Sequence, residues 1–236
     1  SSATAGVILR ELIGLAELGG DVFFGEPEFE PADLLRTADD GRGVLTAIQL
    51  AAVQDRPALF STFLMWLLAE LFEELPEVGD VDRPKLVFFL DEAHLLFSGA
   101  SKAFLESVTQ TVRLIRSKGV GIFFVTQNPT DVPSAVLGQL GNRVQHALRT
   151  FTPEDAKALR TTVSTFPKTE DYDLEELLTS LGIGEAAVTV LSDRGTPTPV
   201  AATLLRAPRS LMAPVDPAVL QQAVQVSPLQ RRYGQE

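Results

Sequence analysis

The sequence predicts a doubly wound α/β fold, with a mainly parallel sheet and a small α+β extension at its C-terminal end. Residues 85–90 and 120–127 are continuous apolar segments rich in aromatic and β-branched side chains, as expected for strands buried on both faces of a parallel sheet. A helical pattern over 101–118 separates them, and a third strand is expected at 143–149. Strands that alternate with helices in this way are typical of doubly wound parallel sheets.

The composition is that of one large soluble domain, or of one domain with a small satellite. The chain has 236 residues, of which 45% are hydrophobic and 22% are charged. It contains no cysteine, which excludes disulfides, thiolate zinc sites and a cysteine nucleophile, and which is compatible with a reducing cytoplasm. Because the net charge is −11, any contact with DNA would need a local basic patch or residues outside this sequence.

Four elements are expected before the first buried strand. Apolar residues at helical spacing predict a helix over 7–18, which a glycine pair ends. An irregular connection follows, with at most a short helix at 32–36, and residues 41–50 predict a short strand. A long helix can begin at Pro57, because proline is tolerated in the first turn of a helix.

The sequence predicts neither a membrane span nor an export signal. The longest apolar run, residues 58–71, is short and interrupted by polar side chains, so we interpret it as a buried helix. The N-terminal apolar stretch contains Arg10, Glu11 and Glu17, which a secretory signal would not tolerate. We therefore expect a cytoplasmic protein that has no contact with a membrane.

The remaining elements are short, and the chain changes character after residue 150. The expected elements are helices at 134–140, 152–163, 173–181 and 214–226, and the two strands of a hairpin at 185–193 and 198–205. We therefore expect two parts: residues 1–150 as part of an α/β core, and residues 151–236 as an extension that completes or flanks it.

Two adjacent carboxylates, Asp91 and Glu92, follow the first buried strand. In an open parallel sheet, ligands bind beyond the carboxyl ends of the strands, which is where these two side chains would lie. Phosphoryl transfer to water needs one carboxylate that holds Mg²⁺ and one that orients or deprotonates the attacking water. The alternative is structural: Asp91 caps the helix that follows, and Glu92 is solvated.

The second buried strand also ends in polar side chains, Thr126, Gln127 and Asn128. A glutamine or asparagine at this place can sense the γ-phosphate of a nucleotide or hold the attacking water. The alternative is a simple turn, because Asn128-Pro129 is an ordinary turn dipeptide. Two successive strands that both end in polar groups favour a shared ligand site.

Three segments together resemble the second half of the motor domain of HerA-like ATPases: KLVFFLDEAHLLF, VRLIRSKGVGIFFVTQNP and VLGQLGNRVQHALR. The resemblance covers most of the chain and implies an incomplete RecA-like core of a P-loop NTPase, with ATP and Mg²⁺ as cofactors. It also implies a homo-hexameric motor of the FtsK/HerA group that translocates double-stranded DNA and can work with a nuclease partner.

The resemblance implies a role for four residues by their positions in these segments. Asp91 matches the Walker B acid that holds Mg²⁺, Glu92 the catalytic glutamate and Gln127 the polar sensor. Arg116 matches the arginine that reaches the nucleotide of a neighbouring subunit, where a guanidinium offers several donors to developing phosphate charge. An open alternative is that Arg116 only pairs with nearby acids, and three other arginines compete for its role: Arg113, Arg143 and Arg149.

One feature of the family is missing, because the sequence contains no GxxxxGK[ST] phosphate-binding loop. In the family this loop precedes the residues found here, so the simplest expectation is a fragment that begins after it. We therefore expect that this chain alone neither hydrolyses ATP nor binds it tightly.

The sequence also bears on functions other than that of a motor ATPase. The letters DEAH at 91–94 also occur in DEAH-box RNA helicases, but the S-A-T and QxxGRxGR motifs of those enzymes are absent. His94 is a poor candidate for a metal ligand, because no partner at ligand spacing is visible. Two alternatives stay open: a non-enzymatic oligomerisation or regulatory lobe of a P-loop protein, and a P-loop ATPase that remodels protein.

Overall fold

A single long helix, α3 (Pro57–Glu74), lies at the centre of a hydrophobic core. Its first residue is proline, as expected for a helix start. Leu59, Leu67 and Leu71 are almost completely buried, so the interpretation of residues 58–71 as a buried helix is confirmed. Of the helices that the structure describes, none is long and apolar enough to cross a membrane.

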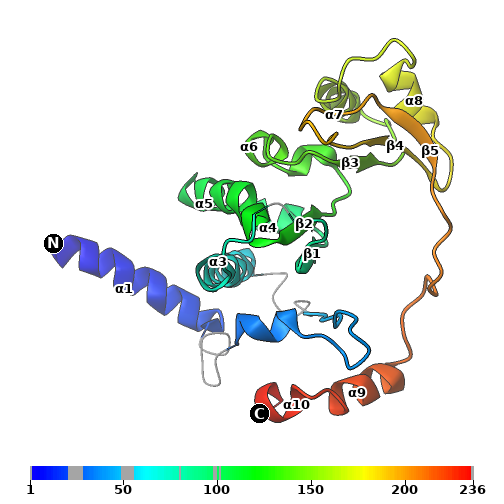
Figure 1. Cartoon of the computed structure of the whole chain (residues 1–236). Helices are drawn as coiled ribbons and strands as arrows, with labels where there is room; N and C mark the ends of the chain where they lie inside the picture. Colours follow the sequence, from blue (N-terminus) through cyan, green and yellow to red (C-terminus); the bar gives the residue numbers. More distant parts are fainter. Residues whose placement is uncertain are drawn as a thin grey trace. The chain divides into compact units, whose positions relative to one another are not determined.

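The structure is a computed structural model (Figure 1). It describes residues 2–20, 29–48, 56–79, 81–97, 100 and 102–234.

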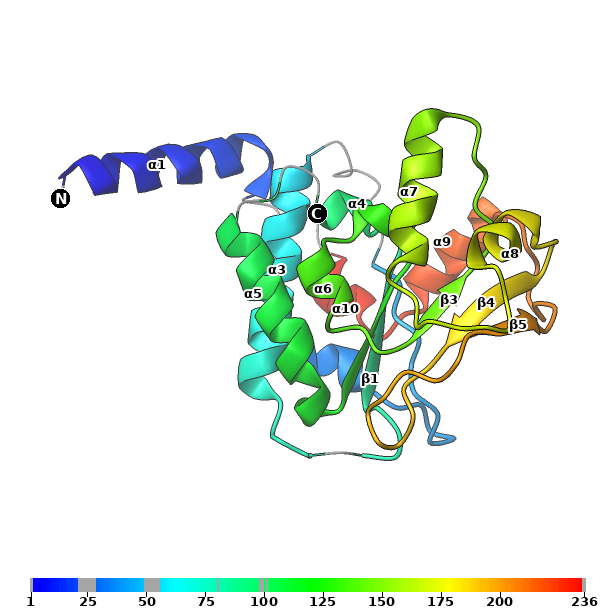
Figure 2. The same ribbon diagram turned by 90° about the horizontal axis from the view of Figure 1, so that it is seen from above.

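Strands β1 (Leu86–Leu90) and β2 (Val120–Phe124) form a parallel pair, in register along their whole length. The connection between them contains the short helix α4 (His94–Phe97), helix α5 (Lys102–Leu114) and the 3-10 turn η3 (Ile115–Lys118). Helices α3 and α5 lie on the same side of the two strands (Figure 2). The strand, helix and strand expected from 85 to 127 are therefore confirmed, and they form a parallel unit.

The two faces of this strand pair differ. Phe88 and Phe124 pack against the core that surrounds α3. On the other face, Phe89 and Phe123 stack with their ring centroids 4.7 Å apart and remain 66% and 53% exposed. Side chains alternate between the faces of a strand, so the apolar segments place aromatic rings on both.

Two of the expected strands differ from the prediction. In the described part of the predicted strand at 41–50, the only pairing is an isolated bridge between Gly43 and Thr37, while residues 49 and 50 lie outside the described residues. The strand predicted at 143–149 forms as β3 (Arg143–Gln145), but it pairs antiparallel with β4 (Glu185–Thr189). The expectation that it joins the parallel sheet is wrong, because a downstream strand is its partner. Among the described residues the parallel sheet therefore has two strands.

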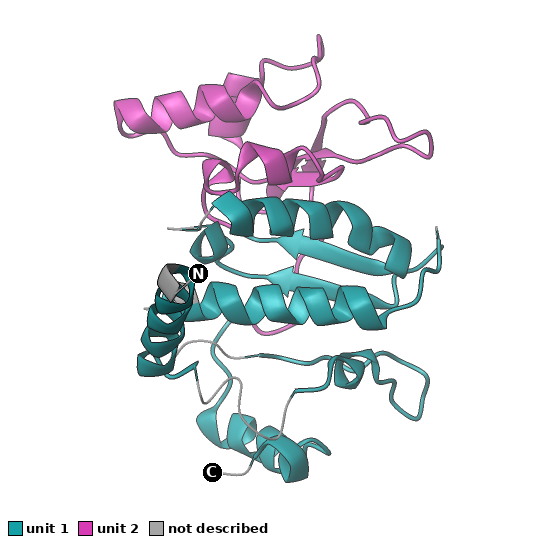
Figure 3. Cartoon of the chain, turned by 90° about the vertical axis from the view of Figure 1, so that its left-hand side faces the viewer, with its two compact units in different colours: residues 1–125, 213–236 teal, residues 126–212 magenta. Residues whose placement is uncertain are grey.

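Residues Thr126–Met212 form one of two structural units, and residues Ser1–Val125 with Ala213–Glu236 form the other (Figure 3). The units do not coincide with the ranges 1–150 and 151–236 expected from the sequence. The first unit contains the parallel strands, and the C-terminal residues belong to it as well.

The second unit is built around a three-stranded antiparallel sheet, β3-β4-β5. Strand β5 (Ala201–Leu204) pairs with β4, which confirms the predicted hairpin. Helices α7 (Pro153–Val163) and α8 (Leu174–Ser180) pack on the sheet through Leu159 and Leu178. Two short elements precede β3: η4 (Pro129–Asp131) and α6 (Ser134–Leu137).

The first unit also contains the elements near both ends of the sequence. Helix α1 (Ser2–Glu17) and the 3-10 helix η1 (Pro31–Leu35) confirm the helices predicted at 7–18 and 32–36. Near the C-terminus, α9 (Pro217–Gln225) confirms the helix predicted at 214–226, but it is not the last helix, because the short helix α10 (Gln230–Tyr233) follows it.

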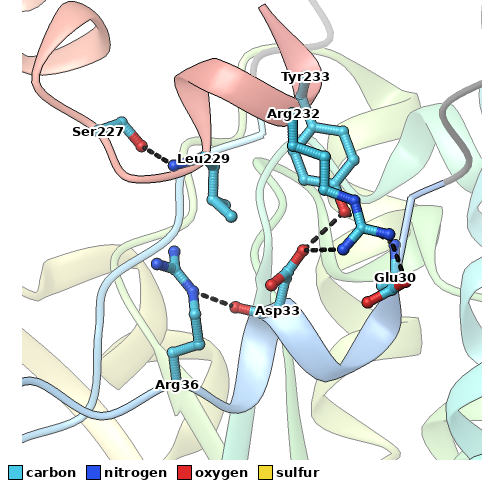
Figure 4. Close-up of polar contacts among 7 residues, drawn as sticks. All are labelled: Glu30, Asp33, Arg36, Ser227, Leu229, Arg232 and Tyr233. Atoms are coloured by element: carbon cyan, nitrogen blue, oxygen red, sulfur yellow. Dashed lines mark hydrogen bonds and ion pairs between the residues drawn. The ribbon is translucent and has the colours of Figure 1, made fainter.

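Helix α10 is held on η1 by a polar cluster (Figure 4). The Tyr233 hydroxyl donates to Asp33 Oδ2 at 2.6 Å and accepts the Glu30 N–H at 3.1 Å. Arg232 forms an ion pair with Glu30, and its hydrogen bond lowers the pKa of the Glu30 carboxyl. Burial raises the pKa of Tyr233, and the bond to Asp33 adds to this effect. The last turn of the chain is therefore tied to a segment about 200 positions earlier.

Candidate functional site

The acidic pair lies in a tight turn, Asp91 to Ala93, directly after β1. The exposed Asp91 side chain accepts the Glu92 N–H at 3.0 Å through Oδ1. Ala93 donates its N–H to the Val125 carbonyl at 2.9 Å, and the Val125 N–H bonds back to the Leu90 carbonyl at 2.9 Å. The turn is thereby tied to the residue that follows β2. This hydrogen bond counts against the alternative in which Asp91 caps a helix, because its carboxylate accepts an N–H of the turn itself.

Glu92 has an unusual backbone conformation. Its φ is 50°, and of the residues described by the structure it is the one non-glycine residue with a positive φ. For a residue with a Cβ, the left-handed region costs about 1–2 kcal/mol, and such strain is often found at functional sites. Ala93, next in the turn, is completely buried. The surrounding bonds therefore fix a conformation that Glu92 would not adopt by itself.

The Glu92 side chain contacts the first residue of helix α4 (His94–Phe97). Glu92 Oε2 lies 3.1 Å from His94 Nδ1. The Oε2 atom is shielded from solvent, although the two side chains as wholes are 42% and 40% exposed. One carboxylate oxygen is thus directed at the imidazole within the structure.

Asp91 has the chemistry of a ligand for nucleotide-bound Mg²⁺. Within the described ranges, no three acidic or histidine side chains gather in an arrangement that could hold a metal ion. Mg²⁺ in nucleotide sites usually keeps several waters and takes only one or two carboxylates, with phosphate oxygens as further ligands. A single exposed carboxylate at a strand end fits that donor set, and it does not fit a metal site made of protein ligands alone.

Arg116 lies at the other end of the sheet. It is an exposed residue of η3, and its carbonyl accepts the Gly119 N–H at 2.9 Å where η3 ends. Gly119 has a φ of 75°, so a left-handed turn leads directly into β2. Glu92 follows the end of β1, whereas Arg116 precedes the start of β2, and a five-residue strand spans about 13 Å from its first to its last residue. Within the first unit, the structure does not bring Arg116 and Glu92 together.

The three competing arginines lie in different settings. Arg143 Nη1 donates to Thr165 Oγ1 at 2.6 Å, and its guanidinium lies 4.6 Å from the centroid of the Phe166 ring. Burial lowers the pKa of Arg143. Arg113 and Arg149 are exposed. Arg143 is therefore occupied by contacts within its own unit, which makes it the weakest of the alternatives to Arg116.

The polar residues after β2 belong to the second unit. Thr126 Oγ1 donates to Asp131 Oδ2 at 2.8 Å, and Asn128 precedes η4, whose Asp131 N–H bonds to the Asn128 carbonyl at 3.1 Å. The turn expected at Asn128-Pro129 is therefore present. Gln127 is exposed in the bend between them, two residues after Val125. Its role as a sensor stays a prediction.

His94 is the residue that the sequence did not reveal. The sequence raises it only as a poor candidate for a metal ligand, whereas in the structure it contacts the Glu92 carboxylate. A signal was present, because a histidine two residues after a strand-end glutamate can reach it around a tight turn. That spacing alone did not predict the contact, because the sequence does not reveal that the Glu92 backbone is left-handed.

Comparison with known proteins identifies one family. The whole chain, residues 1–236, matches the family described as Helicase HerA-like C-terminal. No curated protein matches the chain. A solved structure with some similarity is the genome packaging NTPase B204 from Sulfolobus turreted icosahedral virus 2 in complex with AMP. It has 15% sequence identity and a TM-score of 0.43, over 75% of this chain and 73% of that chain.

Proposed function

We propose that this chain, which belongs to the Helicase HerA-like C-terminal family, supplies the magnesium-binding and water-activating acids of an ATPase motor. The observation that carries the proposal is the Asp91 to Ala93 turn at the carboxyl end of β1, bonded to the residue after β2. Ligands of open parallel sheets bind at this edge. Two carboxylates with different settings, one exposed and one with a shielded oxygen, suit two different roles.

In this proposal the two acids divide the work of hydrolysis. Asp91 would hold Mg²⁺, and the ion would neutralise charge on the phosphate oxygens. Glu92 would orient the attacking water and accept its proton as the water attacks the γ-phosphorus in line, while the bond from that phosphorus to the β–γ bridging oxygen breaks and ADP leaves. The resemblance assigns Gln127, a residue of the second unit, the role of polar sensor for the γ-phosphate or the attacking water, and this role stays a proposal.

An ATPase of this kind needs a phosphate-binding loop, and this sequence has no GxxxxGK[ST] motif. Backbone N–H groups of such a loop and its lysine are what hold the phosphates in P-loop enzymes. We therefore propose that the chain works together with a segment or protein that carries the loop, and that the 236 residues alone bind ATP weakly.

The motor is proposed to be a homo-hexamer that acts on double-stranded DNA in the cytoplasm. The family description names a helicase, which supports a nucleic acid substrate. Arg116 would act on the nucleotide of the adjacent subunit, because within its own unit it lies at the opposite end of the strands from Glu92. With a net charge of −11, DNA would be contacted through a local basic surface, and a nuclease is a candidate partner.

The test is a single substitution in the protein assembled with its phosphate-binding loop. Glu92→Gln should abolish ATP turnover while nucleotide binding, measured by calorimetry, stays close to wild type. Glu106→Gln, on the exposed face of α5, is the matched control and should leave turnover unchanged. Turnover close to wild type in Glu92→Gln would assign Glu92 a structural role.

The same assay separates the alternatives. A regulatory lobe would give no turnover in the wild-type assembly, although the assembly forms. A protein-remodelling ATPase would turn over ATP without stimulation by double-stranded DNA. DNA-stimulated turnover that depends on Glu92 is the result expected for the proposed motor.

A further inference from the structure

We infer that residues 227–233 act as a reversible clasp, which limits how far the second unit can move from the first. The second unit, Thr126–Met212, is inserted in the first, so the chain leaves the first unit after Val125 and re-enters it at Ala213. The clasp is the contact of residues 227–233 with η1, which also belongs to the first unit. When the clasp opens, only the connection after β2 still leads from the second unit to an anchored part of the first.

The clasp is made by two side chains of α10 that meet η1 (Figure 4). The Tyr233 hydroxyl donates to Asp33 Oδ2 at 2.6 Å, a length typical of hydrogen bonds from hydroxyls to carboxylates, and it accepts the Glu30 N–H at 3.1 Å. Arg232 pairs with Glu30, and its Nη1 lies 3.7 Å from Asp33 Oδ2. The Tyr233 ring also contacts Phe29, with the centroids 5.7 Å apart. These directional contacts are specific to an arginine followed by a tyrosine.

The chain before the clasp is exposed over a long stretch. Every residue from 206 to 226, the whole of α9 included, is exposed, and half-buried residues return only at Ser227 and Leu229. Helix α9 is capped by its own segment, because Asp216 Oδ1 accepts the Ala218 N–H at 2.8 Å. Burial of the C-terminal part of the chain is therefore concentrated in residues 227–233, and these residues anchor the exposed stretch to the first unit.

The length of the exposed stretch sets the limit that a closed clasp imposes. The ordered part of the second unit ends near Leu205, whose N–H bonds to the Gly184 carbonyl at 2.8 Å. Residues 206–215, which join it to α9, can extend by at most about 35 Å. An open clasp removes this limit, and domains that share few connections move relative to one another by default. Because the clasp is intramolecular, with an effective concentration on the order of millimolar, it can close with few contacts and still open reversibly.

The first test opens the clasp from the side of η1. Glu30→Ala combined with Asp33→Ala removes both carboxylates and leaves the sequence of α10 intact. Backbone order parameters of Arg232 and Tyr233, from nitrogen NMR relaxation of the 236-residue chain, should fall from about 0.85 to below about 0.6, because a four-residue helix does not persist without its contacts. Adding Tyr233→Phe to this variant should have no further effect, because the hydroxyl has already lost its carboxylate partner.

The second test measures the movement of the second unit. The chain has no cysteine, so Glu106→Cys on α5 and Glu176→Cys on α8 place one spin label on an exposed position of each unit. Pulsed electron spin resonance then gives the distribution of distances between the labels. Opening the clasp with Glu30→Ala and Asp33→Ala should broaden this distribution and add distances beyond the longest of the wild type.

A matched control removes the same charge outside the clasp. Asp39→Ala combined with Asp40→Ala changes two exposed carboxylates in the turn after η1, where Asp40 bonds Arg42, and it should leave both measurements as in the wild type. Order in α10 that survives the loss of Glu30 and Asp33, or a distance distribution unchanged when that order is lost, would overturn the inference. Order that disappears on dilution of the wild type would place the clasp on a second copy of the chain and would overturn it as well.

Discussion

Glu92 and Arg116 lie at opposite ends of the same pair of parallel strands. Glu92 follows the last residue of β1, while Arg116 precedes the first residue of β2, and the two strands are in register. A shared site within one copy of the first unit would require an arginine side chain to reach past the whole length of β2. A site at which both residues act on one nucleotide therefore needs two subunits.

The left-handed conformation of Glu92 predicts an unusual response to glycine. Glu92→Ala and Glu92→Gly both remove the side chain, but only alanine keeps the left-handed strain. We expect the glycine variant to be as stable as the alanine variant or more stable by up to about 1 kcal/mol in chemical denaturation. At Glu106, inside helix α5, glycine should instead be about 1 kcal/mol less stable than alanine. The same order at both positions would contradict the strained turn.

A buried lysine stabilises the first unit. Lys118, at the end of η3, is 8% exposed, and its Nζ donates to the Leu75 carbonyl at 2.6 Å. Nζ also lies 4.7 Å from the Phe72 ring centroid and 3.5 Å from Glu77 Oε1. Lys118→Met keeps the apolar stem but leaves a buried carbonyl without its donor, so we expect a loss of about 2 kcal/mol in free energy of unfolding.

The matched control for Lys118 is Lys102→Met. Lys102 is 90% exposed and pairs with Glu106 at 3.7 Å on the surface of α5. Its substitution should change stability by less than about 0.5 kcal/mol. Equal effects of the two substitutions would show that the Lys118 contacts do not contribute to folding.

A capping box gives the second unit a dependence on pH. Asp155 accepts the N–H groups of Phe151 and Thr152, both at 2.9 Å, and the Thr152 side chain caps α7. These hydrogen bonds lower the pKa of the Asp155 carboxyl from its ordinary value, and the bond from the Phe151 N–H has the largest effect. A lowered pKa in the folded state stabilises the fold above the ordinary pKa near 4, and this contribution disappears as the pH falls through the lowered value.

Asp155→Asn should therefore destabilise α7 at pH 7 and should have progressively less effect below about pH 4. Thermal or chemical unfolding of both proteins between pH 7 and pH 3 measures the difference. Asp171→Asn, at an exposed position between α7 and α8, is a suitable comparison. A difference that is independent of pH would mean that the charge of Asp155 does not contribute to the cap.

The parts of the fold that could be predicted are those in which the local pattern determines the result. The segments at β1 and β2 are continuous apolar runs, and α3 is apolar on nearly every side, so burial requires the structure that the pattern indicates. The hairpin of β4 and β5 is similarly local, since its strands pair with each other.

The parts that could not be predicted depend on the choice of a distant partner. Strand β3 has a strand-like sequence, but only the position of β4 makes its pairing antiparallel. The contact between Tyr233 and Asp33 joins residues 200 positions apart. At the candidate site, the strand-end positions of Asp91 and Glu92 were predictable, whereas no periodicity encodes the positive φ of Glu92 or its contact with His94.

The central claim is that the acidic turn of one subunit and Arg116 of its neighbour form one ATPase site. The direct test mixes Arg116→Ala subunits with Glu92→Gln subunits, each of them inactive alone, in the assembly that carries the phosphate-binding loop. In some interfaces an intact Glu92 then faces an intact Arg116. Arg113→Ala, three residues earlier and also exposed, replaces Arg116→Ala in the control and shows whether the neighbouring arginine is the active one.

We predict that the mixture recovers ATP turnover, up to about one quarter of the wild-type rate for random mixing of independent sites, because the arginine acts on charge that develops in the transition state. Wild-type subunits diluted with either variant establish whether the sites are independent. If mixed assemblies form, and diluted wild type retains activity in proportion to its share, a mixture without turnover would contradict the claim and would place Arg116 in the fold of its own subunit.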